Sequence, residues 1–371
     1  MNFVLSDQHL ARREEFRRFA TEELDRGEQF PAENLRQAAR KGYLGLPLPF
    51  EWSGGGTDFL TYTLLIEELS RVCAATGLII AVHTSVGTYP LYYFGTQEQK
   101  QRYLCGLARG ELLGAFALTE PEAGSDAGNL STSAYKSGAG YLLNGTKLFI
   151  TSGDRADLYT VFATIDRKLG HKGITAFLVE KNRAGLIPGK PEKKMGLNRS
   201  NTTELRLEDL YIPVSNRLGE EGMGFSIAMA LLDGGRIGIA AQALGLARAA
   251  IDYTKTYLKE EQGQSGLKTG QGPAFKLADL ATKLEASRLL VYRAAQIKDA
   301  GRKCSREAAM AKYYSADLAM EAAICCMNIC GFPAAGFDHP LAGYFCDAKA
   351  TQIYEGTNQI QRLVVARELL Q

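Results

Sequence analysis

The sequence predicts an α+β fold in three blocks: helices at residues 1–113, strands at 114–224 and helices again at 225–371. Apolar residues recur at helical spacing in the first and third blocks, whereas the middle block holds short segments rich in β-branched and aromatic residues. Strands and helices do not alternate along the chain, which excludes a parallel α/β sheet. A chain of 371 residues is long enough for two or three domain-sized units.

The first block is helical because its apolar positions repeat every three to four residues. The segment 58–71 (DFLTYTLLIEELSR) places four leucines close to one helical stripe. A run of three glycines at 54–56 breaks the chain before it.

The middle block contains the strand candidates YLLNGTKLFIT, LYTVFATI, GITAFLVE and TELRLEDLYI, separated by Gly, Asn and Asp. Helical periodicity returns after residue 224. It continues through long stretches at 225–260, 275–299 and 306–330.

Composition excludes several classes of protein. The 43 Lys and Arg residues nearly balance 41 Asp and Glu, so there is no electrostatic case for a nucleic-acid or membrane-surface partner. No uncharged apolar run reaches the roughly 18–20 residues of a membrane span. The first residues meet charge too early for a secretory signal, and seven scattered cysteines suit a reducing compartment. We therefore expect a cytoplasmic protein.

Most common chemical motifs are absent: no G-x-G-x-x-G follows a strand, and neither H-E-x-x-H nor G-x-S-x-G occurs. Cys325, Cys326 and Cys330, with His339, imitate a metal site. These cysteines lie in an apolar helical run, which favours buried thiols and no metal. His83 follows an apolar stretch and precedes two hydroxyl residues, which favours a packing or capping role.

Two segments suggest chemistry. In 116–128 (FALTEPEAGSDAG), backbone N–H groups beside Thr119 and Ser125 would suit an anionic or carbonyl-rich ligand, although the segment would also serve as a plain loop. In 352–367 (QIYEGTNQIQRLVVAR), Glu355 precedes a helix start. Such a carboxylate is either a helix-dipole partner or a catalytic group.

Together these segments resemble the two signatures of the acyl-CoA dehydrogenase family. The stretches LNGTKLFIT, GEEGMGFSIAM and LDGGRIGIAAQALGLA lie between them in the family's order and spacing. The resemblance spans nearly the whole chain. It implies an N-terminal α-helical domain, a middle β-domain and a C-terminal α-helical bundle, and it is closest to the short-chain, butyryl-type branch.

The resemblance also implies a reaction. Members remove a proton from Cα of an acyl-CoA thioester while a hydride leaves Cβ for the N5 atom of FAD. Glu355 occupies the position of the base, its backbone N–H would help to hold the thioester oxygen, and burial would raise its pKa. Tyr354 would line the acyl pocket.

The family pattern assigns the remaining site residues. Expected FAD-binding residues are Phe116, Leu118, Thr119, Ser125, Phe149, Thr151, Thr357 and Gln359. Expected substrate-binding residues are Ser125, Asp233, Arg236, Tyr354 and Gly356.

Two positions indicate which branch of the family the chain resembles. Some branches carry the base at the position of Gly235, and a glycine there leaves Glu355 as the candidate. Glutaryl-specific members carry an arginine in the acyl pocket, whereas the corresponding stretch 76–79 (TGLI) has none. A simple aliphatic acyl group is therefore expected.

Three positions depart from the family pattern. Glu260 stands where relatives have an arginine, Gly263 where they have phenylalanine, and Phe332 where they have glycine. In relatives these elements reach the ADP half of the neighbouring subunit's FAD. Three explanations follow: a homotetramer that binds FAD more weakly, a mixed tetramer completed by a related subunit, or a flavin-free acyl-thioester-binding protein.

The expected redox partner is electron-transferring flavoprotein, because a flavin in this family usually passes electrons to it. Acyl length and branching, the physiological direction, and a choice between coenzyme A and a carrier protein stay open.

Overall fold

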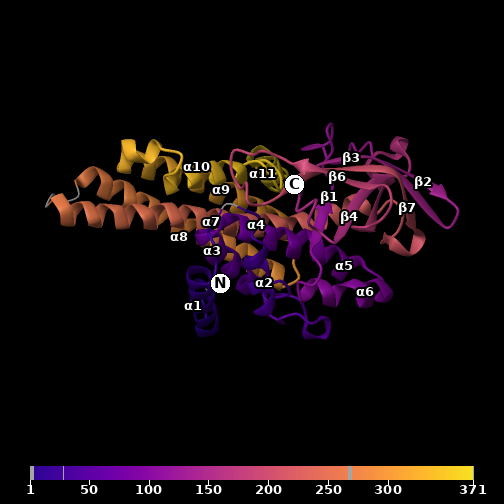
Figure 1. Ribbon diagram of the computed structural model, residues 1–371, viewed down its shortest axis with the longest axis horizontal. Helices are drawn as coiled ribbons and strands as arrows, with labels where there is room; N and C mark the ends of the chain where they lie inside the picture. The colour runs from indigo at the N-terminus through magenta and orange to yellow at the C-terminus, as the bar shows by residue number, and fades with distance from the viewer. Residues whose placement is uncertain (1–3, 28, 266–269, 371) are drawn as a thin grey trace.

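The computed structural model describes residues 4–27, 29–265 and 270–370, with only the backbone described at 262–265. Figure 1 shows an elongated molecule with a sheet at one end, long helices running away from it, and shorter N-terminal helices along one side. The surroundings of Gly263 lie outside the described residues.

The N-terminal part is helical, as the sequence predicts. Its α-helices are α1 (Asp7–Glu22), α2 (Ala32–Arg40), α3 (Phe59–Val72), α4 (Ala74–Val82), α5 (Tyr89–Phe94) and α6 (Gln97–Ala108). Helix α3 begins at an N-cap, Asp58, whose side chain accepts from the Thr61 N–H at 2.7 Å. Every residue from 59 to 70 is buried, so this helix forms the centre of the N-terminal layer.

A π-helical turn, His83–Thr88, connects α4 to α5. His83 is fully buried, and burial lowers its pKa to about 4. Its neutral ring accepts from the Gly114 N–H at 3.0 Å through Nδ1, and its Nε2 lies 3.1 Å from the Leu107 carbonyl. The predicted packing role of His83 is confirmed, since the ring joins the helical layer to the first strand.

The middle part is one mixed sheet. Its strands are β1 (Gly114–Ala117), β2 (Ser133–Ser137), β3 (Gly140–Thr151), β4 (Leu158–Thr164), β5 (Ile174–Glu180), β6 (Leu186–Pro191), β7 (Thr202–Pro213) and β8 (Arg217–Leu218). The order is β6-β7-β3-β2-β4-β5-β8, and β1 pairs in parallel with β4. Strands β4 and β5 are buried almost throughout, because the helices cover one of their faces.

The C-terminal part is a bundle of α7 (Gly224–Ser265), α8 (Gln271–Asp299), α9 (Ser305–Cys330), α10 (Pro340–Thr351) and α11 (Asn358–Leu369). Helix α7 is long and apolar enough to cross a membrane by length and composition. However, 78% of its most apolar window is buried inside the protein. It is therefore accounted for as the core helix of the bundle, packed on α9 and α3 (Figure 1).

A buried ion cluster joins the first and last parts. Glu67 and Glu68 of α3 are fully buried. Arg288 of α8 lies 2.7 Å from Glu67, Arg248 of α7 lies 2.5 Å from Glu68, and Arg13 of α1 contacts both. Burial alone would raise the pKa of Glu67, but the arginines outweigh it and lower the pKa.

The predicted fold class is confirmed: helical N- and C-terminal domains flank a sheet domain. The first strand begins at Gly114 and α7 begins at Gly224. We keep domain boundaries at 1–113, 114–224 and 225–371 as a proposal.

Candidate active site

The loop between α10 and α11 carries Glu355 in an unusual backbone conformation. Glu355 has φ +53° and Gly356 has φ +86°, both in the left-handed region. Glycine suits position 356 because of this φ, and a Cβ there would also have to displace Nε2 of Gln361, 2.5 Å away. Gln361 Nε2 donates to the carbonyls of Glu355 and Gly356 at 3.1 and 3.0 Å. The chain therefore holds a non-glycine residue in a conformation that costs energy, which is typical of functional sites.

Thr357, rather than Glu355, is the N-cap of α11. Its Oγ1 accepts from the Ile360 N–H at 3.3 Å. This arrangement removes the capping explanation for the Glu355 carboxylate, which points away from the helix start toward α7.

The Glu355 carboxylate lies against Gly235 of α7. A Cβ at position 235 would come within 2.6 Å of Oε2. Oε2 is itself buried and accepts no hydrogen bond from the described residues. Burial raises the pKa of Glu355 to about 7, against the opposing charges of Arg236 and Lys312. A carboxylate with this pKa can take and release a proton near neutral pH.

Asp233 and Arg236 lie one helical turn apart beside this carboxylate. Arg236 Nη1 donates to Asp233 at 2.8 Å, and Ser305 Oγ donates to the other Asp233 oxygen at 2.6 Å. Arg236 is only 7% exposed, and its Nε has no described hydrogen-bond partner. The site thus retains a buried donor as well as a buried acceptor.

Tyr354, next to Glu355, is half-buried with its hydroxyl facing the helical core. It donates to Gln242 Oε1 at 2.5 Å, and Gln242 Nε2 donates to the Ala74 carbonyl at 3.0 Å. This chain of contacts fixes the tyrosine against α7 and α4.

A bulge in β3 presents an aromatic ring to solvent. Phe149 has φ +56° and is 62% exposed, at the point where the pairing of β3 with β7 shifts register. The adjacent Leu148 N–H donates to the Thr119 carbonyl at 2.9 Å. Thr119, just after β1, therefore lies beside Leu148, and Thr151 follows Phe149 two positions along β3. Both threonines are half-buried.

The segment after Thr119 is held by a buried ion pair. Lys147 of β3 is fully buried and lies 2.7 Å from Glu120. The second Glu120 oxygen accepts from Ser131 N and Oγ at 2.6 and 2.7 Å and from the Thr132 N–H. Burial would raise the pKa of Glu120, but these partners lower it to about 2. The pair closes the base of the loop at 121–130.

The other expected cofactor positions differ in exposure. Ser125 and Gln359 are exposed, Leu118 is buried, and the Phe116 ring packs edge-on against Phe162 with centroids 4.9 Å apart. Nothing in these contacts brings Ser125 to Glu355.

The residues present fit FAD. An exposed aromatic ring in a strained, bulged strand, with two half-buried threonines nearby, offers a flat apolar surface and hydroxyl groups for an isoalloxazine ring. Thr119, Phe149 and Thr151 would hold the ring, and Ser125 is placed on an exposed loop where it could meet a phosphate.

The departures from the family pattern lie at the surface. Glu260 is exposed near the end of α7, and Phe332, after α9, is 92% exposed. Phe337, nearby, is 97% exposed. These side chains are therefore available to another subunit.

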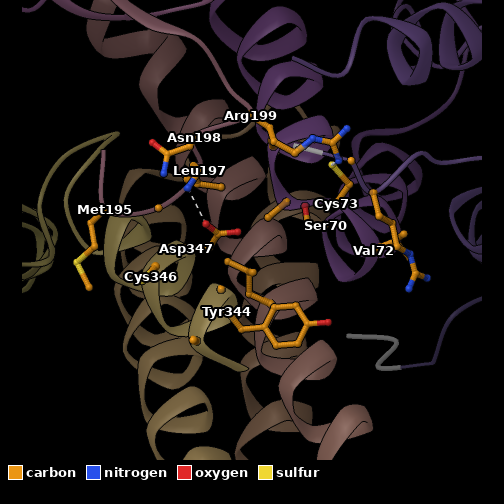
Figure 2. A pocket seen from close by; sticks show the side chains of 18 of the residues that line it. Ser70, Val72, Cys73, Met195, Leu197, Asn198, Arg199, Tyr344, Cys346 and Asp347 are labelled. Carbon is orange, nitrogen blue, oxygen red and sulfur yellow. Dashed lines mark hydrogen bonds between the residues drawn. The ribbon is translucent and has the colours of Figure 1, made fainter. Parts of the chain in front are cut away.

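A cavity of about 640 Å³ lies apart from the Glu355 loop. Figure 2 shows Asp347 of α10 in this cavity, where it accepts from the Leu197 N–H at 2.6 Å. Burial raises the pKa of Asp347 to about 6. Arg199 is held by Asp25 at 3.0 Å and by the Gln29 carbonyl at 2.9 Å, so it is not a free phosphate ligand. None of the expected site residues lines this cavity.

Sequence reasoning missed three residues that support the site. Lys312 and Gln361 hold the Glu355 loop, and Lys147 holds Glu120. A lysine inside an apolar helical run was a signal for Lys312. The described residues contain no His, Cys, Asp or Glu cluster suited to a metal ion.

Comparison with known proteins agrees with this geometry. Three family models match in order: the acyl-CoA dehydrogenase N-terminal domain at 6–111, the middle domain at 115–210 and the C-terminal domain at 222–370. The chain is 49% identical over 352 residues to an acyl-CoA dehydrogenase of Bacillus subtilis, covering 95% of this chain and 93% of the relative. It is 44% identical over 377 residues to a short-chain-specific acyl-CoA dehydrogenase of Clostridium acetobutylicum, covering all of both chains.

Solved structures of related proteins also resemble this chain in fold and sequence. The butyryl-CoA dehydrogenase of Megasphaera elsdenii superposes with a TM-score of 0.95 at 39% identity and full coverage of both chains. A chain from work on the electron transferring flavoprotein of Acidaminococcus fermentans and flavin-based electron bifurcation gives 0.96 at 43% identity, again with full coverage. The chain therefore belongs to the acyl-CoA dehydrogenase family and is an FAD-dependent oxidoreductase.

Proposed function

We propose that this protein interconverts a short- or medium-chain acyl-CoA and its trans-2-enoyl-CoA, with Glu355 as the catalytic base. One observation carries the assignment of the base: a buried, unpartnered carboxylate oxygen lies against Gly235 on a strained loop, with a pKa raised to about 7. The short-chain relatives support the acyl class.

In the dehydrogenation direction, Glu355 takes the α-proton from the acyl group. By resemblance to the family, the Glu355 backbone N–H is assigned to the thioester oxygen. Tyr354 and Gly356 line the acyl end, while Asp233 and Arg236 face the pantetheine. FAD, when bound, supplies the acceptor for the hydride that leaves Cβ.

Phe116, Leu118, Thr119, Ser125, Phe149, Thr151, Thr357 and Gln359 are proposed as the positions that hold FAD. Phe149 would pack on the ring, and Thr119 and Thr151 would donate to it. Ser125 is proposed to meet both phosphate and substrate.

The test of the base is Glu355→Gln, which keeps the shape of the side chain and removes its basicity. The variant should bind FAD and butyryl-CoA as the wild type does, yet lose anaerobic bleaching of the flavin by about 10²–10⁴-fold in rate. Stopped-flow absorbance would measure this rate. Bleaching at the wild-type rate would show that Glu355 is not the base.

Electron-transferring flavoprotein is the proposed redox partner, supported by the neighbour from work on that protein. A cytoplasmic location is also proposed. Reduction of electron-transferring flavoprotein by butyryl-CoA in the presence of this enzyme tests the partner directly.

We propose a homotetramer as the assembly, and the exposed Phe332 and Phe337 support an interface at that end. The exposed Glu260 favours a second candidate: a mixed tetramer whose other subunit supplies the missing arginine. The flavin content of the purified chain separates them. One FAD per chain at ordinary affinity supports the homotetramer, whereas an FAD-poor chain that Glu260→Arg restores supports the mixed assembly. A chain that takes up no FAD in either form supports a flavin-free acyl-thioester binder.

A further inference from the structure

Lys312 of α9 ends beneath the loop that carries Glu355. Its side chain is fully buried, and its Nζ donates to the Gly356 carbonyl at 2.8 Å and to Asn358 Oδ1 at 3.1 Å. Both acceptors are neutral. Lys312 therefore holds the turn directly after Glu355 without forming a closed ion pair.

Gln361 offers a neutral counterpart to this contact. It is also fully buried, and it donates to the same Gly356 carbonyl at 3.0 Å. One carbonyl of the catalytic loop thus receives one charged and one neutral donor. The two side chains share the task of fixing the loop but differ in charge.

The other charged and titratable groups around this site are mostly compensated. From α7, Arg236 is paired with Asp233 at 2.8 Å. From α9, Asp317 is engaged by Arg362 at 2.7 Å and by two side-chain amides.

Tyr62 of α3 and Tyr354 of the loop also face Glu355, and both have pKa values raised by burial, so they are neutral near pH 7. Lys312 is the described cation near Glu355 whose hydrogen bonds go only to neutral groups.

We propose that Lys312 is a positioning residue for the dehydrogenation, which fixes the Glu355 loop by its hydrogen bonds and favours the ionised form of the Glu355 carboxylate by its positive charge. The inference rests on the proposed role of Glu355 as base. It is supported by the mutual effect of the two groups: Glu355 opposes the burial that lowers the pKa of Lys312, and Lys312 opposes the burial that raises the pKa of Glu355.

The experiment compares Lys312→Met with Gln361→Met. Both remove one donor to the Gly356 carbonyl and one further contact, to Asn358 or to the Glu355 carbonyl, but only the first removes a charge. The pH dependence of kcat/KM is measured with butyryl-CoA and a chemical electron acceptor. Lys312→Met should move the acidic limb to higher pH, because it removes a positive charge that opposes the effect of burial on Glu355. Gln361→Met should lower kcat and leave the limb in place.

Two further variants keep the test decisive. Lys312→Arg should restore the position of the limb, because it keeps the charge, and Lys312→Gln tests the neutral form if the methionine variant folds poorly. An unchanged limb in a folded, neutral variant overturns the proposal. An equal shift in Gln361→Met would also overturn it, because loop geometry alone would then explain the effect.

A readout without turnover separates this inference from the proposed function. The difference in melting temperature between the wild type and Glu355→Gln, followed over pH, reports the titration of Glu355 together with its effect on Lys312. Its midpoint should rise when the comparison is repeated in the Lys312→Met background. Flavin bleaching that persists in Glu355→Gln would show that Glu355 is not the base. A midpoint that stays unchanged in the Lys312→Met background would show that Lys312 does not affect the titration of Glu355.

Discussion

Two buried lysines lie beside two carboxylates in this protein, and the two regions use them in opposite ways. At the base of the loop after Thr119, Lys147 pairs with Glu120 at 2.7 Å, and Ser131 and Thr132 supply further donors. At the loop before α11, Lys312 gives its hydrogen bonds to neutral acceptors and leaves the Glu355 oxygen Oε2 unpartnered.

The difference shows how one fold sets two carboxyl groups to different tasks. Partners that outweigh burial lower the pKa of Glu120 to about 2, so it stays ionised and structural. Burial that outweighs the nearby charges raises the pKa of Glu355 to about 7, so it can exchange a proton. The number of donors to each carboxylate therefore sets its pKa, and with it a structural role for Glu120 or a proton-transfer role for Glu355.

The largest effect is expected for Lys147→Met, which tests the structural role of the Lys147–Glu120 pair. Removing one partner of a buried ion pair costs about 3–5 kcal/mol, because the other charge stays buried. We expect the free energy of unfolding in urea to fall by this amount and bound FAD to be lost. A loss below about 1 kcal/mol would mean that Ser131 and Thr132 alone satisfy Glu120.

Gly235→Ala should act on the catalytic region without harming the scaffold. The new Cβ would lie 2.6 Å from Glu355 Oε2, so the carboxylate must move. Misplacement by about 1 Å can cost on the order of 10²-fold in kcat. Steady-state kinetics measure this loss, and the free energy of unfolding should change by no more than about 1 kcal/mol.

Gly234→Ala is the matched control on the same helix. Its Cβ would meet the flexible end of Lys298 at 3.3 Å and the Phe59 ring at an ordinary contact distance of 3.7 Å, so kcat should fall less than about threefold. Equal losses in the two variants would show that α7 itself, and not Glu355, is disturbed.

The pH dependence of stability should have opposite signs in the two regions. Glu355 has a raised pKa, so its contribution is fully present below about pH 4.5 and is lost as pH rises through about 7. Glu120 has a lowered pKa, so its contribution is present above about pH 4.5 and is lost as pH falls through about 2. Glu355→Gln should therefore gain stability relative to the wild type between pH 5 and 8, by on the order of 1–3 kcal/mol.

Urea unfolding at a series of pH values measures this gain. Ser131→Ala serves as the control, since it changes no charge and Glu120, with a pKa lowered to about 2, stays ionised over the same range. A flat difference for Glu355→Gln would mean that Glu355 is ionised throughout and lacks the raised pKa.

The smallest effect is expected for Ser131→Ala. This change removes one hydroxyl donor from Glu120 and leaves the backbone N–H of residue 131 in place. A hydrogen bond to a charged group contributes about 1.5–3 kcal/mol, and the remaining donors should reduce the loss to about 1 kcal/mol. Thermal unfolding measures it. A loss equal to that of Lys147→Met would contradict the shared satisfaction of Glu120.

Much of this organisation could be predicted from the sequence, because periodicity and local signatures carry it. The segment 58–71 is α3 within one residue, and the long stretch after residue 224 is α7. Glu355 could be singled out because its motif is continuous in the chain.

What could not be predicted depends on contacts between distant segments. Lys147 and Glu120 are 27 positions apart, and Lys312 and Gly356 are 44 apart, so neither pairing has a local signal. The left-handed backbone at Phe149 and Glu355 also lacks the glycine that usually marks it. Packing imposes these conformations, and they became visible only in the folded chain.

Helix α7 has a consequence for how the protein tolerates changes in length. It spans 42 residues, about 63 Å, and contacts α3 and α4 of the first part, β4 and β5 of the sheet, and α8, α9 and α10 of the bundle. Inserting one residue after Gly235 would rotate everything beyond it by about 100° and shift it by about 1.5 Å. The length of α7 therefore fixes the relative positions of all three parts. Insertions should be tolerated far better in the surface loops than within this helix.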